Sequence, residues 1–131
     1  MIEQMKASIM RTVHDLFPSL KLYDKETNGK IKSPSLYFNE PFAIGFLDNK
    51  DQYGRTFTIN ILILHDSTNK AINVGNEILN AIMANKSRVY LYNQDGTISS
   101  DYLQINEIQV EESDEDSARL QLVWNVKNSF N

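Results

Sequence analysis

The residue types that carry most protein chemistry are sparse in this 131-residue sequence. It has no cysteine and only two histidines, His14 and His65, so disulfides and thiolate metal sites are excluded. Neither histidine has carboxylates at metal-ligand spacing, which favours surface or boundary histidines over a zinc or iron site. No serine lies in a nucleophile-elbow motif, and no glycine-rich loop follows a predicted strand. The sequence therefore predicts no catalytic residue, no cofactor site and no metal site.

One acidic run, Glu-Glu-Ser-Asp-Glu-Asp at residues 111–116, resembles a calcium-binding loop in charge. It lacks the alternating aspartates, the glycine and the distal glutamate that such a loop needs. We therefore interpret it as a solvated connection between two strands.

The overall charge and the first residues narrow the class of protein further. The chain carries 17 acidic and 13 basic residues, a net charge of −4, which disfavours a nucleic-acid-binding surface. An acidic residue, Glu3, comes early, and no uninterrupted apolar run follows it, so we expect neither a signal peptide nor a membrane span. The protein is expected to stay in the compartment where it is made.

The fold is predicted to be organised around a central strand at residues 55–65. Successive side chains of a strand point to opposite faces, so this segment has one fully apolar face and one face that changes from polar to apolar. Both faces should therefore be partly covered. The first face holds Phe57, Ile59, Ile61 and Ile63, and the second holds Thr58, Asn60, Leu62 and Leu64.

Two amphipathic helices are predicted beside this strand. Residues 2–16 carry apolar side chains at three- and four-residue steps, and Pro18 should end the helix. The second helix should start after the capping side chains of residues 66–68 and run to about Ala84.

The remaining segments are predicted to form strands. In residues 35–46 the apolar residues fall at even positions with Glu40 as the interruption, and Pro41 predicts a bulge, a bend or an edge. Trp124 should point into the core with its alternating apolar neighbours. A polar loop is expected at residues 24–33. The other strand segments are 20–23, 89–92, 102–110 and 120–126, and a phase change in the apolar residues predicts a bulge within 102–110.

This order of elements predicts an α+β fold, with a mixed or antiparallel β-sheet of five to six strands and two α-helices packed on one side. No linker divides the chain, so residues 1–131 are expected to form a single domain.

The segment Leu47 to Gly54 is predicted to be a protruding hydrophilic connection. It is longer than the two to five residues that a hairpin needs. Such a connection is either an arm that contacts another molecule or a mobile solvent loop. The candidate contact residues are Asp48, Asn49, Lys50, Asp51, Gln52 and Tyr53, with Arg55 at the base of the connection.

Several stretches resemble the tail terminator proteins of tailed phages and of phage tail-like particles in low-GC Gram-positive bacteria. They are the first helix with its ending Leu-Phe-Pro at residues 16–18, Leu-Lys-Leu-Tyr at 20–23, Ser-Pro-Ser-Leu-Tyr-Phe at 33–38, and Tyr-Gly-Arg-Thr-Phe-Thr-Ile-Asn-Ile at 53–61. The resemblance covers most of the chain as an order of elements.

The resemblance implies a structural protein without catalytic turnover. It implies a ring, usually a hexamer, that caps the head-proximal end of the tail tube and stops tube polymerisation. The implied partners are further copies of the chain, the tail tube protein, and a sheath or neck protein, with no nucleic-acid recognition and no membrane. The implied location is the bacterial cytoplasm during assembly and then the virion or tail-like particle. In this setting the connection Leu47 to Gly54 would reach a neighbouring subunit or the tube, and Arg55 would pair with an acidic group there.

Two other classes of function stay open at this stage. One is another neck, head-tail joining or tail completion protein. The other is a small ligand-binding domain or enzyme, which would require a concave pocket with converging polar groups.

Overall fold

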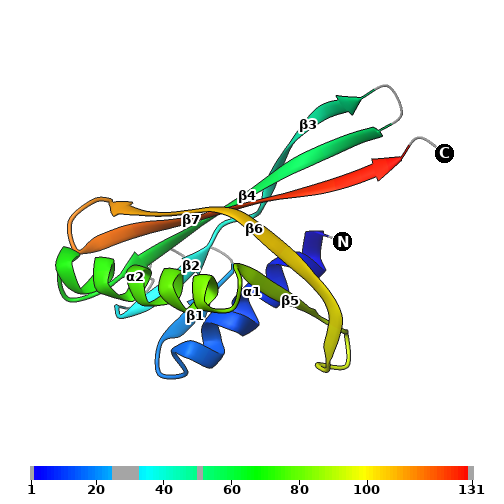
Figure 1. Ribbon diagram of the computed structural model, residues 1–131. Coiled ribbons are helices and arrows are strands. Elements are labelled where there is room, and N and C mark those ends of the chain that lie inside the picture. Colours follow the sequence, from blue (N-terminus) through cyan, green and yellow to red (C-terminus); the bar gives the residue numbers. More distant parts are fainter. Residues whose placement is uncertain (1, 25–32, 50–51, 130–131) are drawn as a thin grey trace.

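The computed structural model describes residues 2–24, 33–49 and 52–129 of the chain. These residues form two helices and seven strands (Figure 1). In chain order they are α1 (Ile2–Leu16), β1 (Lys21–Tyr23), β2 (Ser35–Phe38), β3 (Phe42–Asn49), β4 (Gln52–Leu64), α2 (Thr68–Ala84), β5 (Arg88–Tyr92), β6 (Ile98–Glu112) and β7 (Ser117–Ser129). The predicted α+β fold class is confirmed.

The seven strands form one mixed sheet in the order β1-β2-β4-β7-β6-β5, with β3 also paired to β4. Only β1 and β2 are parallel to each other, and every other neighbouring pair is antiparallel. The predicted central strand is confirmed, because β4 pairs with β2 and β3 along one edge and with β7 along its whole other edge.

The core lies between one face of this sheet and the two helices, which lie on the same side of it (Figure 1). The four apolar residues predicted for one face of β4, from Phe57 to Ile63, are all fully buried. On the opposite face Thr58 is buried, and Leu62 and Leu64 are partly buried, so the prediction that both faces are covered to some extent is confirmed.

Trp124 sits at the centre of this core and is 0% exposed, as its alternation in β7 predicts. Its ring stacks on Phe57 of the neighbouring strand, with 5.7 Å between the ring centroids and 11° between the planes. Its indole Nε1 donates a hydrogen bond to Sδ of Met5 in α1 at 3.2 Å. Trp124 therefore joins the two central strands to the first helix.

The helices begin and end where the sequence predicts. The first ends at Leu16, two residues before Pro18, which disfavours further helical residues ahead of it. The second has Ser67 as its N-cap, whose hydroxyl accepts a hydrogen bond from the Lys70 backbone N–H at 3.2 Å. Gly75 brings α2 close to the sheet, since a Cβ at this position would lie 2.8 Å from Cγ1 of Val110.

The stretch predicted as one strand at residues 35–46 is divided into β2 and β3 by a bulge. Phe38 lies opposite Ile61, and Phe42 lies opposite Thr58. Residues 39–41 therefore face only two residues of β4, and Pro41, which has no N–H to donate, lies within the bulge. This division explains why the sheet has seven strands and the sequence predicted five to six.

The bulge also moves the apolar stripe to the other face of the sheet. Leu36 and Phe38 are 0% exposed in the core, whereas Phe42 and Ile44 are 50% and 66% exposed. One extra residue reverses the alternation of every side chain that follows it. The prediction of a single stripe interrupted only at Glu40 is therefore wrong.

The N-terminal helix is anchored to this bulge through Lys6. Lys6 is 7% exposed, and its Nζ lies 2.5 Å from Oε1 of Glu40 and 3.2 Å from the carbonyl oxygen of Asp24. On the other side of the helix, the hydroxyl of Ser8 accepts a hydrogen bond from the backbone N–H of Tyr92 at 2.9 Å. The helix thus links β5 to the segment between β2 and β3.

A second bulge, predicted from the phase change in residues 102–110, is present at Asn106 in β6. Ile105 pairs with Trp124, and Glu107 pairs with Val123, so the register shifts by one residue between them. Before this bulge β6 pairs with β5, and after it β6 pairs with β7. The strand therefore leaves β7 at Trp124 and turns toward the α1 side of the molecule (Figure 1).

Two further sequence predictions concern a polar loop and a membrane-spanning helix. The polar loop predicted at residues 24–33 falls almost entirely outside the described residues. Among the helices that are described, neither has the length and apolar content needed to cross a membrane.

Candidate assembly surface

Three strands extend from the body of the protein as a ribbon (Figure 1). We call this ribbon the arm and define it as β3 (Phe42–Asn49), residues 52–58 of β4, and residues 125–129 of β7. Its order is β3-β4-β7, because β4 pairs with both of the other strands. The arm projects beyond the helices, so its outer end does not contribute to the core they enclose.

The arm corrects the prediction of a long connection at Leu47 to Gly54. Asp48 and Asn49 belong to β3, and Gln52, Tyr53 and Arg55 belong to β4. The two predicted contact residues between these strands, Lys50 and Asp51, lie outside the described residues. The apparent excess length is thus strand, and Asn49 pairs directly with Gln52. Polar residues are compatible with a strand here because backbone pairing forms it, without burial of side chains in a core.

Arg55, predicted to mark the base of the contact segment, lies where the arm leaves the body. Its guanidinium carbon is 5.4 Å from the centroid of the Phe57 ring. Its Nε is buried and has no hydrogen-bond partner among the described residues. The same holds for Nε of Arg88 and the hydroxyl of Ser35, so this feature does not by itself distinguish Arg55 as a contact residue.

The face of the arm that points away from the helices combines apolar and polar side chains. Phe42 and Ile44 are exposed on β3, beside Thr56 of β4. Across β4, the hydroxyl of Thr56 donates to Oδ1 of Asn125 at 2.9 Å. Nearer the body, Nε2 of Gln121 donates to Oδ1 of Asn60 at 3.0 Å. This face is therefore an ordered surface with exposed apolar side chains at its β3 edge.

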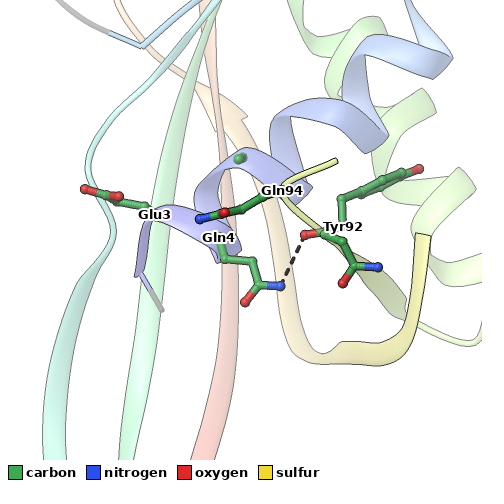
Figure 2. A pocket seen from close by; sticks show the side chains of 6 residues that line it. Glu3, Gln4, Tyr92 and Gln94 are labelled. Carbon is green, nitrogen blue, oxygen red and sulfur yellow. Dashed lines mark hydrogen bonds between the residues drawn. The ribbon is translucent and has the colours of Figure 1, made fainter. Parts of the chain in front are cut away.

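A cleft of about 570 Å³ lies between the start of α1 and the end of β5. Figure 2 shows Gln4 of α1 directed toward Tyr92, whose carbonyl oxygen accepts a hydrogen bond from Nε2 of Gln4 at 3.2 Å. The lining consists of Glu3, Gln4, Ala7, Tyr92, Asn93 and Gln94. Among these described lining residues are one carboxylate, one phenol and several amides, and no hydrogen bond among them pairs a nucleophile with a general base.

His65 and the acidic run have local structural partners. His14 is exposed on α1, and Nδ1 of His65 accepts a hydrogen bond from the Asp66 backbone N–H at 2.8 Å. In the acidic run, Glu111 forms an ion pair with Arg119 of the neighbouring strand. Within the described ranges, no group of three histidine or carboxylate side chains is placed to bind a metal ion.

The sequence reasoning missed the most exposed candidate contact residues, Phe42 and Ile44. Their apolar character and even spacing are visible in the sequence and place them in one predicted stripe with Leu36 and Phe38. The signal that could have identified them is Pro41, which marks the bulge that reverses their direction.

Comparison with known sequences adds three findings. No family model matches the chain. The chain is 24% identical over 123 residues to the uncharacterized protein YqbJ of Bacillus subtilis (strain 168), covering 94% of this chain and 83% of that protein. It is 22% identical over 109 residues to the phage-like element PBSX protein XkdJ of the same organism, covering 83% of this chain and 75% of XkdJ.

Among solved structures, the chain is similar to one from the virion of a native gene transfer agent particle. The TM-score is 0.53 at 12% sequence identity, and the match covers 95% of this chain and 94% of the other. At this identity the likeness concerns the fold, and it extends over nearly the whole chain.

Proposed function

We propose that this protein is a structural component of a phage or phage-like particle and that it acts as a tail terminator. In this role, copies of the chain form a ring, expected to be a hexamer, on the head-proximal end of the tail tube. The ring stops tube polymerisation and presents a surface to a neck or sheath protein. The protein acts by association, without catalytic turnover, first in the bacterial cytoplasm and then in the particle.

The observation that carries this proposal is the arm. A terminator must bind its own copies and the tube at once, so each subunit needs at least two complementary surfaces in addition to its core. The arm supplies strands whose outer end contacts neither helix, with exposed Phe42 and Ile44 on one face. Similarity to XkdJ of a phage-like element, and a fold shared with a virion chain, support the same class of particle.

The predicted contact residues keep a role in this proposal, now as strand residues at the end of the arm. Asp48, Asn49, Gln52 and Tyr53 belong to the outer parts of β3 and β4, and Arg55 lies at the base of the arm. We assign the outer end of the arm to contact with a neighbouring subunit or the tube. Arg55 would then donate to an acidic group of that partner.

The test is a shortened arm in the assembled particle. Replacing residues 47–53 by Asn-Gly connects Phe46 to its strand partner Gly54 through a two-residue turn, and the core residues from Phe57 onward are unchanged. The isolated variant should fold, while tails assembled with it should lose length control. Electron micrographs of the tails measure tube length and show whether the protein occupies the head-proximal end.

A matched control shortens the other long hairpin in the same way. Residues 93–97 connect Tyr92 to its strand partner Ile98, and Asn-Gly in their place should leave tail length normal. Normal tails from the shortened-arm variant would contradict the role of the arm. Wild-type protein located between head and neck, and absent from the tube end, would favour a head-tail joining protein instead.

A further inference from the structure

The arm has two strand edges that lack a partner strand in the described part of the chain. On one side, β3 pairs with β4 through residues 42–49, and its outer edge faces no other strand. On the other side, β7 pairs with β4 as far as Ser129, but its pairing with β6 stops at Trp124. The outer edge of β7 is thus uncovered at residues 125–129, because the bulge at Asn106 directs β6 elsewhere.

Uncovered edges are usually protected in proteins that act alone. A free edge presents a row of unpaired N–H and C=O groups, and inward charges, lysines, prolines or bulges prevent it from pairing with another chain. The segment from Phe42 to Gly45 has none of these within it. Its Phe42 and Ile44 side chains are 50% and 66% exposed, and a Cβ added at Gly45 would meet nothing within 4 Å. This edge is therefore open to a partner strand.

We propose that β3 of one subunit pairs with the outer edge of β7, residues 125–129, of a neighbouring copy. This inference rests on the proposed ring and names the contact that would close it. Both strands are antiparallel to β4, so they are parallel to each other, and pairing them continues the sheet in the same direction.

A second copy of the chain fits these edges better than an unrelated peptide. One edge lies on each side of the same ribbon, so each copy offers what the next one needs, and the contact is heterologous. Repeating it by rotation gives a closed ring of arms, with Phe42 and Ile44 of one copy beside β7 of the next. A β3-to-β3 contact would instead stop at a dimer and leave both β7 edges uncovered.

The absence of cysteine from the chain allows a direct test by disulfide formation. Ile44→Cys and Asn125→Cys place one thiol on each edge, on the same face of the arm, since both residues lie opposite Thr56. Within one subunit these positions are two strand spacings apart, about 10 Å, which is beyond the roughly 7 Å that a disulfide spans. A disulfide between them therefore reports contact between copies.

The double variant Ile44→Cys/Asn125→Cys should give a ladder of covalent multimers when assembled particles are oxidised. Phe42→Cys/Asn125→Cys tests the same contact with the two strands shifted by two residues. Each single variant should give monomer. The matched control is Ile44→Cys/Arg119→Cys, in which the second thiol lies on β7 where Glu111 of β6 covers the edge, and it should give no ladder.

Two results would overturn the inference. Dimers from Ile44→Cys alone would show that β3 pairs with β3, and monomers from both double variants would show that the two edges do not meet. Wild-type particles in the same experiment show whether the protein occupies the tube end. Occupancy without a ladder refutes the edge contact alone, whereas a ladder without occupancy refutes the terminator role alone.

Discussion

Removing the Trp124 side chain should cause one of the largest losses of stability that a single substitution can produce in this protein. Trp124 is the only tryptophan, is 0% exposed, and contacts both Phe57 and Met5. Trp124→Ala leaves a cavity where β4, β7 and α1 meet, and large-to-small changes of this kind cost about 3–5 kcal/mol. The free energy of unfolding of an ordinary domain is about 5–15 kcal/mol, so the variant loses a large part of it.

The measurement is urea unfolding of the isolated subunit, followed by far-ultraviolet circular dichroism. With a urea dependence of about 2 kcal/mol per molar, the midpoint should fall by roughly 1.5–2.5 M. Trp124→Phe keeps a ring on Phe57 and should cost less than half as much, so it still gives a reading if the alanine variant does not fold. Native fluorescence of the wild-type protein should show a buried indole.

The matched control is Ile44→Ala, a similar loss of apolar side chain at a position that is 66% exposed. Its unfolding free energy in the isolated subunit should change by no more than about 0.5 kcal/mol. If Trp124→Ala and Ile44→Ala shifted the midpoint equally, or if native Trp124 fluoresced as in water, the assignment of the two faces would be refuted.

Three further predictions concern single positions. Gly75→Ala should fail to show the roughly 1 kcal/mol gain in unfolding free energy typical of a helical glycine, because its Cβ would crowd Val110, and a double-mutant cycle with Val110→Ala should reveal coupling. Ser67→Ala should lower thermal stability by about 1 kcal/mol and Ser67→Asp should not, since only the former removes the N-cap acceptor. The hydroxyl and backbone N–H of Thr97 hold the pKa of Asp95 below its ordinary value, so the associated stability is present above that value and lost as pH falls. Thr97→Val should raise this pKa toward the ordinary value in a nuclear magnetic resonance titration.

Much of the fold could be predicted because its elements follow local rules. Pro18 sets the end of α1, and Ser67 caps the start of α2. The central strand is recognised from its own alternating apolar face, so each of these features depends on a few neighbouring residues. The bulge at Asn106 also left a trace in the sequence, because it shifts the phase of buried residues within one strand. Trp124 belongs to the same group, since the last strand alternates strictly.

The arm could not be predicted in the same way. Segments 47–49 and 52–54 are polar, and their strand structure comes from backbone pairing with distant residues such as 127–129. Polarity alone therefore suggested a loop. The change of face at residues 39–41 was hidden for a related reason: the even spacing of apolar residues continues unbroken through a bulge that reverses their direction. Which neighbours the candidate contact residues bind is a property of the assembly. The contact assigned to the residues from Asp48 to Arg55 therefore stays a prediction.

The extra residue between Phe38 and Phe42 makes the pairing of this segment, rather than its composition, decide which side chains the arm presents. Phe38 and Phe42 are an even number of residues apart, so regular alternation would place both on the helix side of the sheet. Paired without the bulge, the same sequence would set Phe42 opposite Phe57, and the small residues Ala43 and Gly45 would face outward. Deleting Glu40 would instead remove the extra residue and keep Phe42 opposite Thr58, so Phe42 and Ile44 would still face outward. One register of pairing thus makes this edge adhesive, and the other would make the same residues inert.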